Sequence, residues 1–150
     1  MVVCNDASAE LVTYSLGSCL GITVYESVKK VGGLLHVMLP DSRIDPAKAA
    51  SAPAMFVDTG VPRLFRALYE LGAERSRVVV KVAGGAQFLD AGGVFNIGER
   101  NQKALNELLM RNGFSIQAAD VGGVISRTLR LELSTGRVQI QSPGVTPYSI

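Results

Sequence analysis

The chain has 150 residues, an apolar fraction of 47% and a formal net charge of +2. So apolar a composition predicts a compact domain with its own core, because disordered chains are poor in apolar residues. The small net charge and the lack of basic stretches interleaved with aromatic residues argue against a nucleic-acid partner. No apolar run reaches the roughly 18 residues of a membrane span, and the first ten residues do not resemble a secretory signal. We therefore expect a cytoplasmic protein without direct membrane insertion.

Apolar periodicity predicts a hairpin near the amino terminus. A short apolar strand over 10–14 is followed by the alternating run 20–25 and by the apolar run 33–39, which Pro40 stops. The polar residues Glu26 to Lys29 suit a loop of about four residues between the last two runs. The stretch 41–53 reads as a surface loop, since it holds Asp and Pro among small polar residues.

The remainder of the chain mixes helices with strands. Apolar residues at helical spacing predict helices over about 61–71 and around 104–109, with Gly72 and Gly113 at their ends. Strands are expected over 78–82, 114–118, 129–133 and 137–141. The chain thus reads as one α/β (mixed α+β) domain over 1–150, with largely antiparallel sheets and two main helices. Its core spans about 10–141, and Pro143 and Pro147 predict a frayed tail over 142–150.

Cys19 and His36 are the residues best suited to covalent chemistry. Cys19 follows Gly17-Ser18 between two predicted strands, where backbone N–H groups near Gly17 and Ser18 would stabilise an oxyanion. The alternative is a cysteine that only fills core space. His36 is the single histidine and interrupts an apolar run, and its alternative is a core histidine bonded to a carbonyl. A loop centred between Ser27 and Val28 would place Cys19 directly opposite His36, as a nucleophile and its base require.

Other polar segments suit either a role at the site or a purely structural one. Thr13, Ser15 and Ser18 are the hydroxyls that could orient the histidine, and spacing does not choose among them. Gly84-Gly85-Ala86 follows a strand and suits either close approach of a substrate or a tight turn. The segment 96–101 precedes a helix, so capping is its expected task. Asp120 and Arg127 suit a turn braced by an ion pair. A lone histidine without a Cys-x-x-Cys pair gives no zinc site.

Several short motifs in order resemble the CheD family of chemoreceptor glutamine deamidases. The similarity runs from about Leu11 to Gln141 and is carried by Thr13-Tyr14-Ser15-Leu16-Gly17-Ser18-Cys19, Gly32-Gly33-Leu34-Leu35-His36-Val37-Met38-Leu39-Pro40-Asp41-Ser42, Lys81-Val82-Ala83-Gly84-Gly85-Ala86, Asn96-Ile97-Gly98-Glu99-Arg100-Asn101, Asp120-Val121-Gly122-Gly123 and Ser134-Thr135-Gly136-Arg137. The chain departs from the family at Tyr14-Ser15, where members often carry Leu-Gly.

The resemblance implies a catalytic trio of Cys19, His36 and Thr13. The residues themselves, apart from the resemblance, place Gly17, Ser18, Gly84 and Gly85 near the expected oxyanion or substrate. The resemblance implies a layered sandwich similar to the catalytic domain of the cytotoxic necrotizing factors. It also implies glutamine side chains of methyl-accepting chemotaxis receptors as substrates and a CheC-type phosphatase of CheY as partner. The chemistry expected is a protein-glutamine glutaminase reaction through a cysteine thioester, without metal or organic cofactor.

Other functions compete with this one. A receptor methyl ester accepts the same attack, so methylesterase activity is a secondary expectation. A binding module that regulates the phosphatase while Cys19 stays idle is the alternative from another class, and both tasks can coexist. A small-molecule amidase is a third reading, favoured if free glutamine or short amides were turned over and receptors were not.

Overall fold

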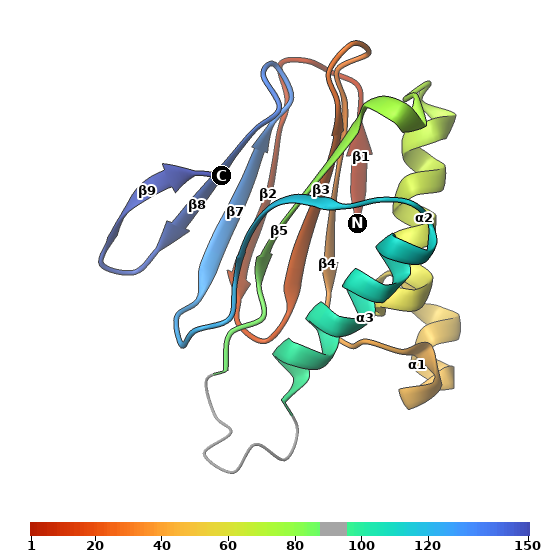
Figure 1. Cartoon of the computed structure of the whole chain (residues 1–150), viewed down its shortest axis with the longest axis vertical. Coiled ribbons are helices and arrows are strands. Elements are labelled where there is room, and N and C mark those ends of the chain that lie inside the picture. The colour runs from red at the N-terminus through yellow and green to blue at the C-terminus, as the bar shows by residue number, and fades with distance from the viewer. Residues whose placement is uncertain (88–95) are drawn as a thin grey trace.

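The computed structural model describes residues 1–87 and 96–150, which form two stacked β-sheets with a layer of helices against one of them (Figure 1). The five-stranded sheet has the order β1-β4-β3-β5-β6, and the four-stranded sheet has the order β2-β7-β8-β9. The strands of the two sheets are β1 (Val2–Cys4), β2 (Glu10–Leu16), β3 (Leu20–Glu26), β4 (Val31–Val37), β5 (Val78–Gly84), β6 (Ile116–Val121), β7 (Arg127–Glu132), β8 (Arg137–Ser142) and β9 (Val145–Ser149). The helices are α1 (Pro46–Ser51), α2 (Val57–Glu70) and α3 (Ile97–Arg111).

The pairing pattern confirms the mixed α+β class with largely antiparallel sheets. β3 and β4 form a hairpin, and β7, β8 and β9 follow one another as an antiparallel meander. β5 and β6 are the parallel pair, and α3 lies between them in the chain. Parallel neighbours need a crossover connection, so α3 must pass over one face of the sheet. The two longest helices of the described chain, α2 and α3, are those that the periodicity predicts.

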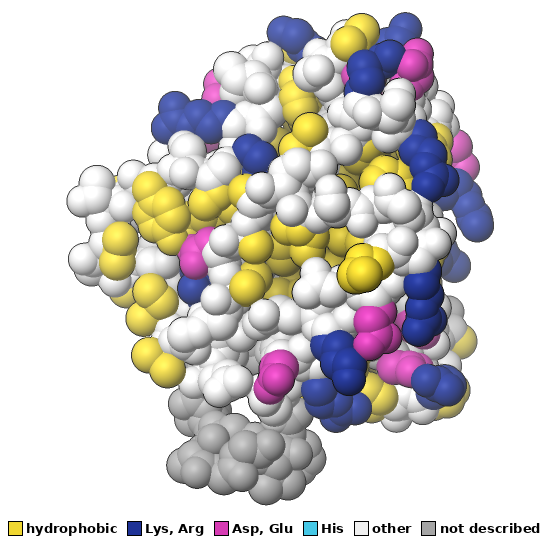
Figure 2. Space-filling model, viewed as in Figure 1, with side chains coloured by type: hydrophobic (Ala, Val, Ile, Leu, Met, Phe, Trp, Pro, Cys, Tyr) yellow, Lys and Arg dark blue, Asp and Glu magenta, His cyan; other side chains and the backbone are white. Residues whose placement is uncertain are grey.

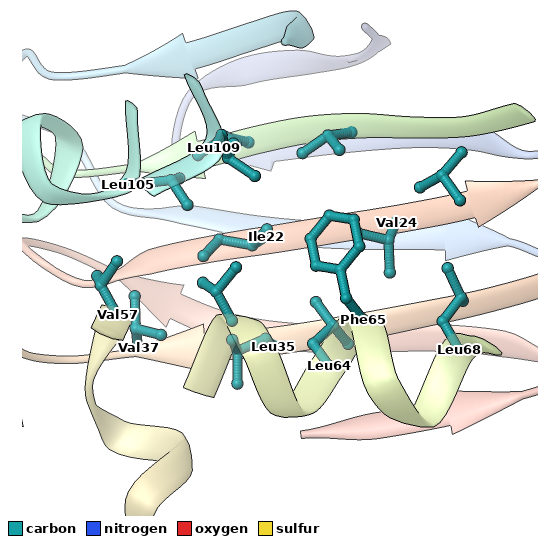
Figure 3. Packing of buried hydrophobic residues seen from close by; sticks show 14 of the residues in the cluster. Ile22, Val24, Leu35, Val37, Val57, Leu64, Phe65, Leu68, Leu105 and Leu109 are labelled. Atoms are coloured by element: carbon teal, nitrogen blue, oxygen red, sulfur yellow. The ribbon is translucent and has the colours of Figure 1, made fainter. Parts of the chain in front are cut away.

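β3 lies at the centre of the molecule and is buried along its whole length. Residues on one face of β3 and β4 pack against α2 and α3, including Ile22, Val24 and Leu35 (Figure 3). Burial on both faces explains why this strand lacks charged residues until Glu26.

A second core fills the space between the two sheets. It is built from apolar side chains of both sheets: Leu11, Leu16, Tyr25, Leu34, Ala83, Leu129, Leu131, Leu133, Val138 and Ile140. Burial of apolar area at roughly 25 cal/mol per Å² makes these two cores the main stabilising contribution. Thr13 and Cys19 belong to segments on the edge of this second core, so the site depends on how the sheets stack.

Two predictions about surface segments are wrong. The predicted frayed tail over 142–150 contains β9, which pairs with β8, and an exposed edge strand tolerates Pro147 because one side of its backbone has no strand partner. The predicted surface loop over 41–53 contains α1, with Pro46 at its first position and Asp45 capping it through Lys48 N–H at 2.9 Å. No helix among residues 1–87 and 96–150 is long and apolar enough to cross a membrane.

Candidate active site

A bulge in β2 allows both Thr13 and Leu16 to face the space between the sheets. Tyr14 and Ser15 lie where the register with β7 shifts, and Ser15 has a left-handed φ of 56°. Side chains three apart on a regular strand point to opposite faces, but Thr13 and Leu16 both approach Gly21 of the facing sheet. The bulge therefore lets Leu16 fill the core while Thr13 reaches across to β4.

Thr13 and His36 form a hydrogen bond between the two sheets. Thr13 Oγ1 lies 2.8 Å from His36 Nδ1, and both side chains are half-buried. Gly21 pairs with His36 across the hairpin, and a Cβ on Gly21 would stand 3.3 Å from Thr13 Cγ2, so glycine leaves room for this approach. Among the described residues, His36 Nε2 is buried without a hydrogen-bond partner. Nε2 is therefore the ring nitrogen left for a reacting group.

The predicted hairpin register is wrong by two residues. His36 pairs with Gly21, because the turn occupies 27–30, with Lys30 at a φ of 52°. Glu26 stays in the strand as a fully buried carboxylate, which Arg77 Nε holds at 2.8 Å. A shift of two residues keeps the same side chains on the same face. Cys19 consequently lies one residue before β3, at the end of the sheet where His36 stands.

The loop that carries Cys19 is fixed through its carbonyl groups. Gly17 C=O accepts a hydrogen bond from Ala86 N–H at 2.8 Å, and Cys19 C=O accepts one from Gly85 N–H at 2.8 Å. Ser18 C=O accepts one from the Asn101 side chain at 3.2 Å. Three consecutive carbonyls are thus bound from the end of β5 and from α3, and the loop has a defined conformation.

The two glycines predicted near the substrate contact this loop. Gly84 has a φ of 111°, and a Cβ there would stand 2.2 Å from Cys19 C=O. Gly85 has a φ of 65° and donates its N–H to the same carbonyl, so that N–H is already used. Both positions require glycine because the backbone is left-handed and closely approached. Their observed contacts support Cys19, and their direct role toward a substrate stays a prediction.

Sequence reasoning missed Asn101, which it grouped with capping residues. Asn96 occupies the N-cap of α3 without a side-chain cap bond, whereas Asn101 is in the second turn and fully buried. Asparagine is unfavourable inside helices, so its position on the same helix face as Ile97 and Leu105, four residues away on either side, was the available signal. The predicted ion pair of Asp120 and Arg127 is confirmed, with Arg127 Nη2 2.9 Å from Asp120 Oδ1.

Burial keeps both Cys19 and His36 in their neutral forms. Desolvation raises the pKa of the Cys19 thiol above its ordinary 9.0, although its own N–H opposes the shift. Desolvation also lowers the pKa of His36 below 6.5, and the positive amino terminus adds to the decrease. Both shifts disfavour a preformed thiolate–imidazolium pair. A neutral thiol and a neutral imidazole are the forms between which a proton can pass during attack on a carbonyl carbon.

The surface shows where the charged residues lie. Lys and Arg side chains gather along the edge that carries the helices, and no histidine is visible on the face shown in Figure 2.

Among residues 1–87 and 96–150, no group of three or more His, Cys, Asp or Glu side chains is arranged to hold a metal ion.

Comparisons with known proteins identify the family of the chain. Residues 38–142 match the family model of CheD chemotactic sensory transduction. A probable chemoreceptor glutamine deamidase CheD 1 of Syntrophus aciditrophicus is 47% identical over 142 residues, which cover 95% of this chain and 89% of the relative. A probable chemoreceptor glutamine deamidase CheD of Solibacter usitatus is 46% identical over 134 residues, covering 89% of this chain and 79% of the relative.

The match to the family model begins at residue 38, so it does not extend to Thr13, Cys19 and His36. The alignment with the Syntrophus protein covers 95% of this chain. The residues outside it are too few to reach from the amino terminus to Thr13, so all three positions lie within the aligned part. Because the family model matches more than half of the chain and these relatives are 46–47% identical to it, the chain belongs to the CheD family.

Proposed function

We propose that this protein deamidates glutamine side chains of chemoreceptors, with Cys19 as nucleophile and His36 as its base. The observation that carries the proposal is the 2.8 Å contact between Thr13 Oγ1 and His36 Nδ1, which leaves Nε2 buried and without a hydrogen-bond partner among the described residues. The names of the relatives supply the substrate class, a glutamine of a chemoreceptor. We place the reaction in the cytoplasm, where thiols stay reduced.

In the first half of the reaction, the Cys19 thiol gives its proton to His36 Nε2 as sulfur attacks the carboxamide carbon. The carbonyl π electrons move to oxygen, and backbone N–H groups of the loop 17–19 stabilise that oxyanion. Each such donor contributes about 2.7–4 kcal/mol in comparable sites. The imidazolium returns the proton to the amide nitrogen, the C–N bond breaks, and ammonia leaves a thioester on Cys19.

In the second half, water attacks the thioester carbon while His36 Nε2 accepts its proton. The C–S bond breaks, the sulfur is protonated again, and the receptor side chain departs as glutamate. Thr13 contributes by accepting a hydrogen bond from Nδ1–H, because this tautomer leaves the lone pair on Nε2. A methyl ester carbonyl fits the same steps, so we propose receptor methylesterase activity as a secondary reaction.

The proposal is tested by intact-mass analysis of a receptor cytoplasmic fragment after incubation with the protein. We expect a gain of about one mass unit at each modified glutamine, because NH2 is replaced by OH. Cys19→Ser and His36→Gln, which preserve size, should abolish the gain. A receptor with known glutamine sites that gains no mass would contradict the proposal.

The same proteins serve a second assay for binding to a CheC-type phosphatase, the partner that the family resemblance implies. If Cys19→Ser still binds the phosphatase while deamidation is lost, the catalytic task and the binding task are separate. If the wild-type protein binds the phosphatase but modifies no receptor, its function is that of a binding module. Incubation with free glutamine tests the small-molecule amidase, which requires ammonia release without a receptor.

A further inference from the structure

Asn101 is a buried polar side chain that the mechanism above does not use. It lies on α3 and has no exposed surface. Its Nδ2 donates two hydrogen bonds, one to Ser18 C=O at 3.2 Å and one to Met38 C=O at 3.1 Å. Among the described residues, its Oδ1 is buried without a hydrogen-bond partner. A buried asparagine that leaves its acceptor unsatisfied needs a reason beyond packing.

The two carbonyl groups belong to the two halves of the proposed site. Ser18 directly precedes Cys19, and Met38 follows His36 by two residues just beyond the end of β4. One nitrogen therefore contacts the backbone next to the nucleophile and the backbone next to the base. A side-chain amide nitrogen has two protons, so it satisfies both carbonyls at once and sets their separation.

The start of α3 is placed so that Asn101 can do this. Gly98 packs against the backbone of Gly85, since a Cβ on Gly98 would stand 2.4 Å from Gly85 C=O. Gly85 N–H in turn binds Cys19 C=O. The start of α3 thus reaches the Cys19 loop through Gly98, by way of Gly85, and through Asn101 on the same face of the helix, and both contacts fix its position relative to the loop.

We infer that Asn101 is a positioning residue that holds the backbone of Cys19 at a fixed distance from that of His36. The inference rests on the proposed function of these two residues. A nucleophile displaced by about 1 Å loses on the order of a hundredfold in rate even when the substrate binds normally. Asn101 therefore acts on the chemical step and does not touch the substrate.

The test compares Asn101→Ala and Asn101→Asp with the wild-type protein. Asn101→Asp keeps the shape but removes both donors, so it faces two carbonyl oxygens with an acceptor. For both variants we expect kcat for receptor deamidation to fall about 10- to 100-fold while KM changes less than about threefold. The rate at which iodoacetamide alkylates Cys19 should change as well, because His36 no longer stands at the right distance to take its proton.

Two variants, one within α3 and one at its C-cap, serve as controls. Asn112→Ala removes an exposed amide that binds Leu108 C=O at 2.8 Å. Leu108→Ala destabilises the packing of α3 without touching the loop. Both should keep the wild-type kcat when compared at equal folded fraction. Equal losses of kcat in Leu108→Ala and Asn101→Ala would overturn the inference, because stability alone would then explain both.

A measurement on the unmodified protein covers the case in which the Asn101 variants do not fold. The side-chain amide protons of Asn101 should exchange slowly with solvent, and their NMR signals should shift when Cys19 is alkylated. Rapid exchange, or signals that ignore alkylation, would overturn the inference. Failure of the proposed function gives a distinct result, because the wild-type protein would then modify no receptor and the comparison with the Asn101 variants would not arise.

Discussion

Thr13 on β2 and His36 on β4 belong to different sheets, yet Thr13 Oγ1 and His36 Nδ1 lie 2.8 Å apart. The contact exists because Thr13 lies on the same face of β2 as Leu11, toward the other sheet, and because Gly21 leaves space beside His36. The stacking of the two sheets therefore decides the orientation of the His36 ring. A change that moves the four-stranded sheet should reduce activity even at a distance from Cys19.

The first prediction concerns the hydroxyl of Thr13. Thr13→Val keeps the shape but removes the partner of His36 Nδ1, which costs about 1–3 kcal/mol and corresponds to about a tenfold to hundredfold lower kcat/KM. Thr13→Ser retains the hydroxyl and should remain within about fivefold of the wild-type value. Receptor deamidation rates of the three proteins check this. Equal rates for Thr13→Val and the wild type would show that His36 is oriented by other contacts.

The second prediction concerns pH. His36 acts as a base only when neutral, and burial lowers its pKa below 6.5. The acid limb of kcat/KM, which reports the free enzyme, should therefore have its midpoint below pH 6.5. The folded state binds the His36 proton less tightly than the unfolded state does. This contribution to stability is complete above pH 6.5 and is lost as the pH falls through the lower, folded-state pKa.

The raised pKa of the Cys19 thiol predicts how its alkylation rate depends on pH. Because burial raises its pKa above 9.0, alkylation by iodoacetamide should accelerate with pH through the neutral range and level off only above 9.0. The measurement is the alkylation rate from pH 5 to 10 with Cys4→Ser as background. A rate that is already maximal near neutral pH would mean a stable thiolate–imidazolium pair and would contradict the neutral resting state.

The third prediction separates a steric clash from backbone strain. Gly84→Ala would bring a Cβ within 2.2 Å of Cys19 C=O, so it must displace the nucleophile loop. Gly122→Ala places alanine at a comparable left-handed φ of 81° but with no atom within 4 Å. Both should lose stability, whereas only Gly84→Ala should also lose most of its kcat. Unfolding midpoints and deamidation rates measured on both variants decide the matter, and equal kcat values would exclude a special role for Gly84.

The fourth prediction concerns the strained residue of the bulge. Ser15 has a φ of 56°, which costs a non-glycine residue about 1–2 kcal/mol. Glycine removes this cost but loses about 0.5–1 kcal/mol through the entropy of the unfolded chain. Ser15→Gly should therefore raise the free energy of unfolding by about 0.5 kcal/mol. Ser15→Val should lower it, since a β-branched residue fits this region poorly. Denaturant unfolding checks both signs, and a more stable Ser15→Val would refute the strain argument.

Sequence periodicity predicted the elements whose apolar pattern is local. The strands near 20–25, 78–82, 129–133 and 137–141 and the two longer helices are confirmed with shifted ends. The hairpin register was wrong because Glu26 looks like a turn residue by itself. Its burial depends on Arg77, which is distant in the chain, and on the N–H groups of Val28 and Lys29. Contacts of this kind have no local signal.

The sequence names candidate residues for the proposed site but does not give their geometry. Cys19, His36 and Thr13 were named from residue type, position and family resemblance. The bulge at Ser15 and the two bonds of Asn101 depend on the stacking of the sheets and the placement of α3, which one sequence does not reveal. Two edge strands were missed: β9 because its exposed residues lack an alternating apolar pattern, and β1 because its 3 residues are too few to show one.

The most direct test of the account is to trap the thioester on Cys19. A receptor fragment is incubated with the wild-type protein in the presence of hydroxylamine, which competes with water for the thioester carbon. The account predicts a hydroxamate, seen as a gain of about 16 mass units at the same glutamine that otherwise gains about one, and no product with Cys19→Ser. Deamidation by Cys19→Ser at the wild-type rate would contradict the central claim.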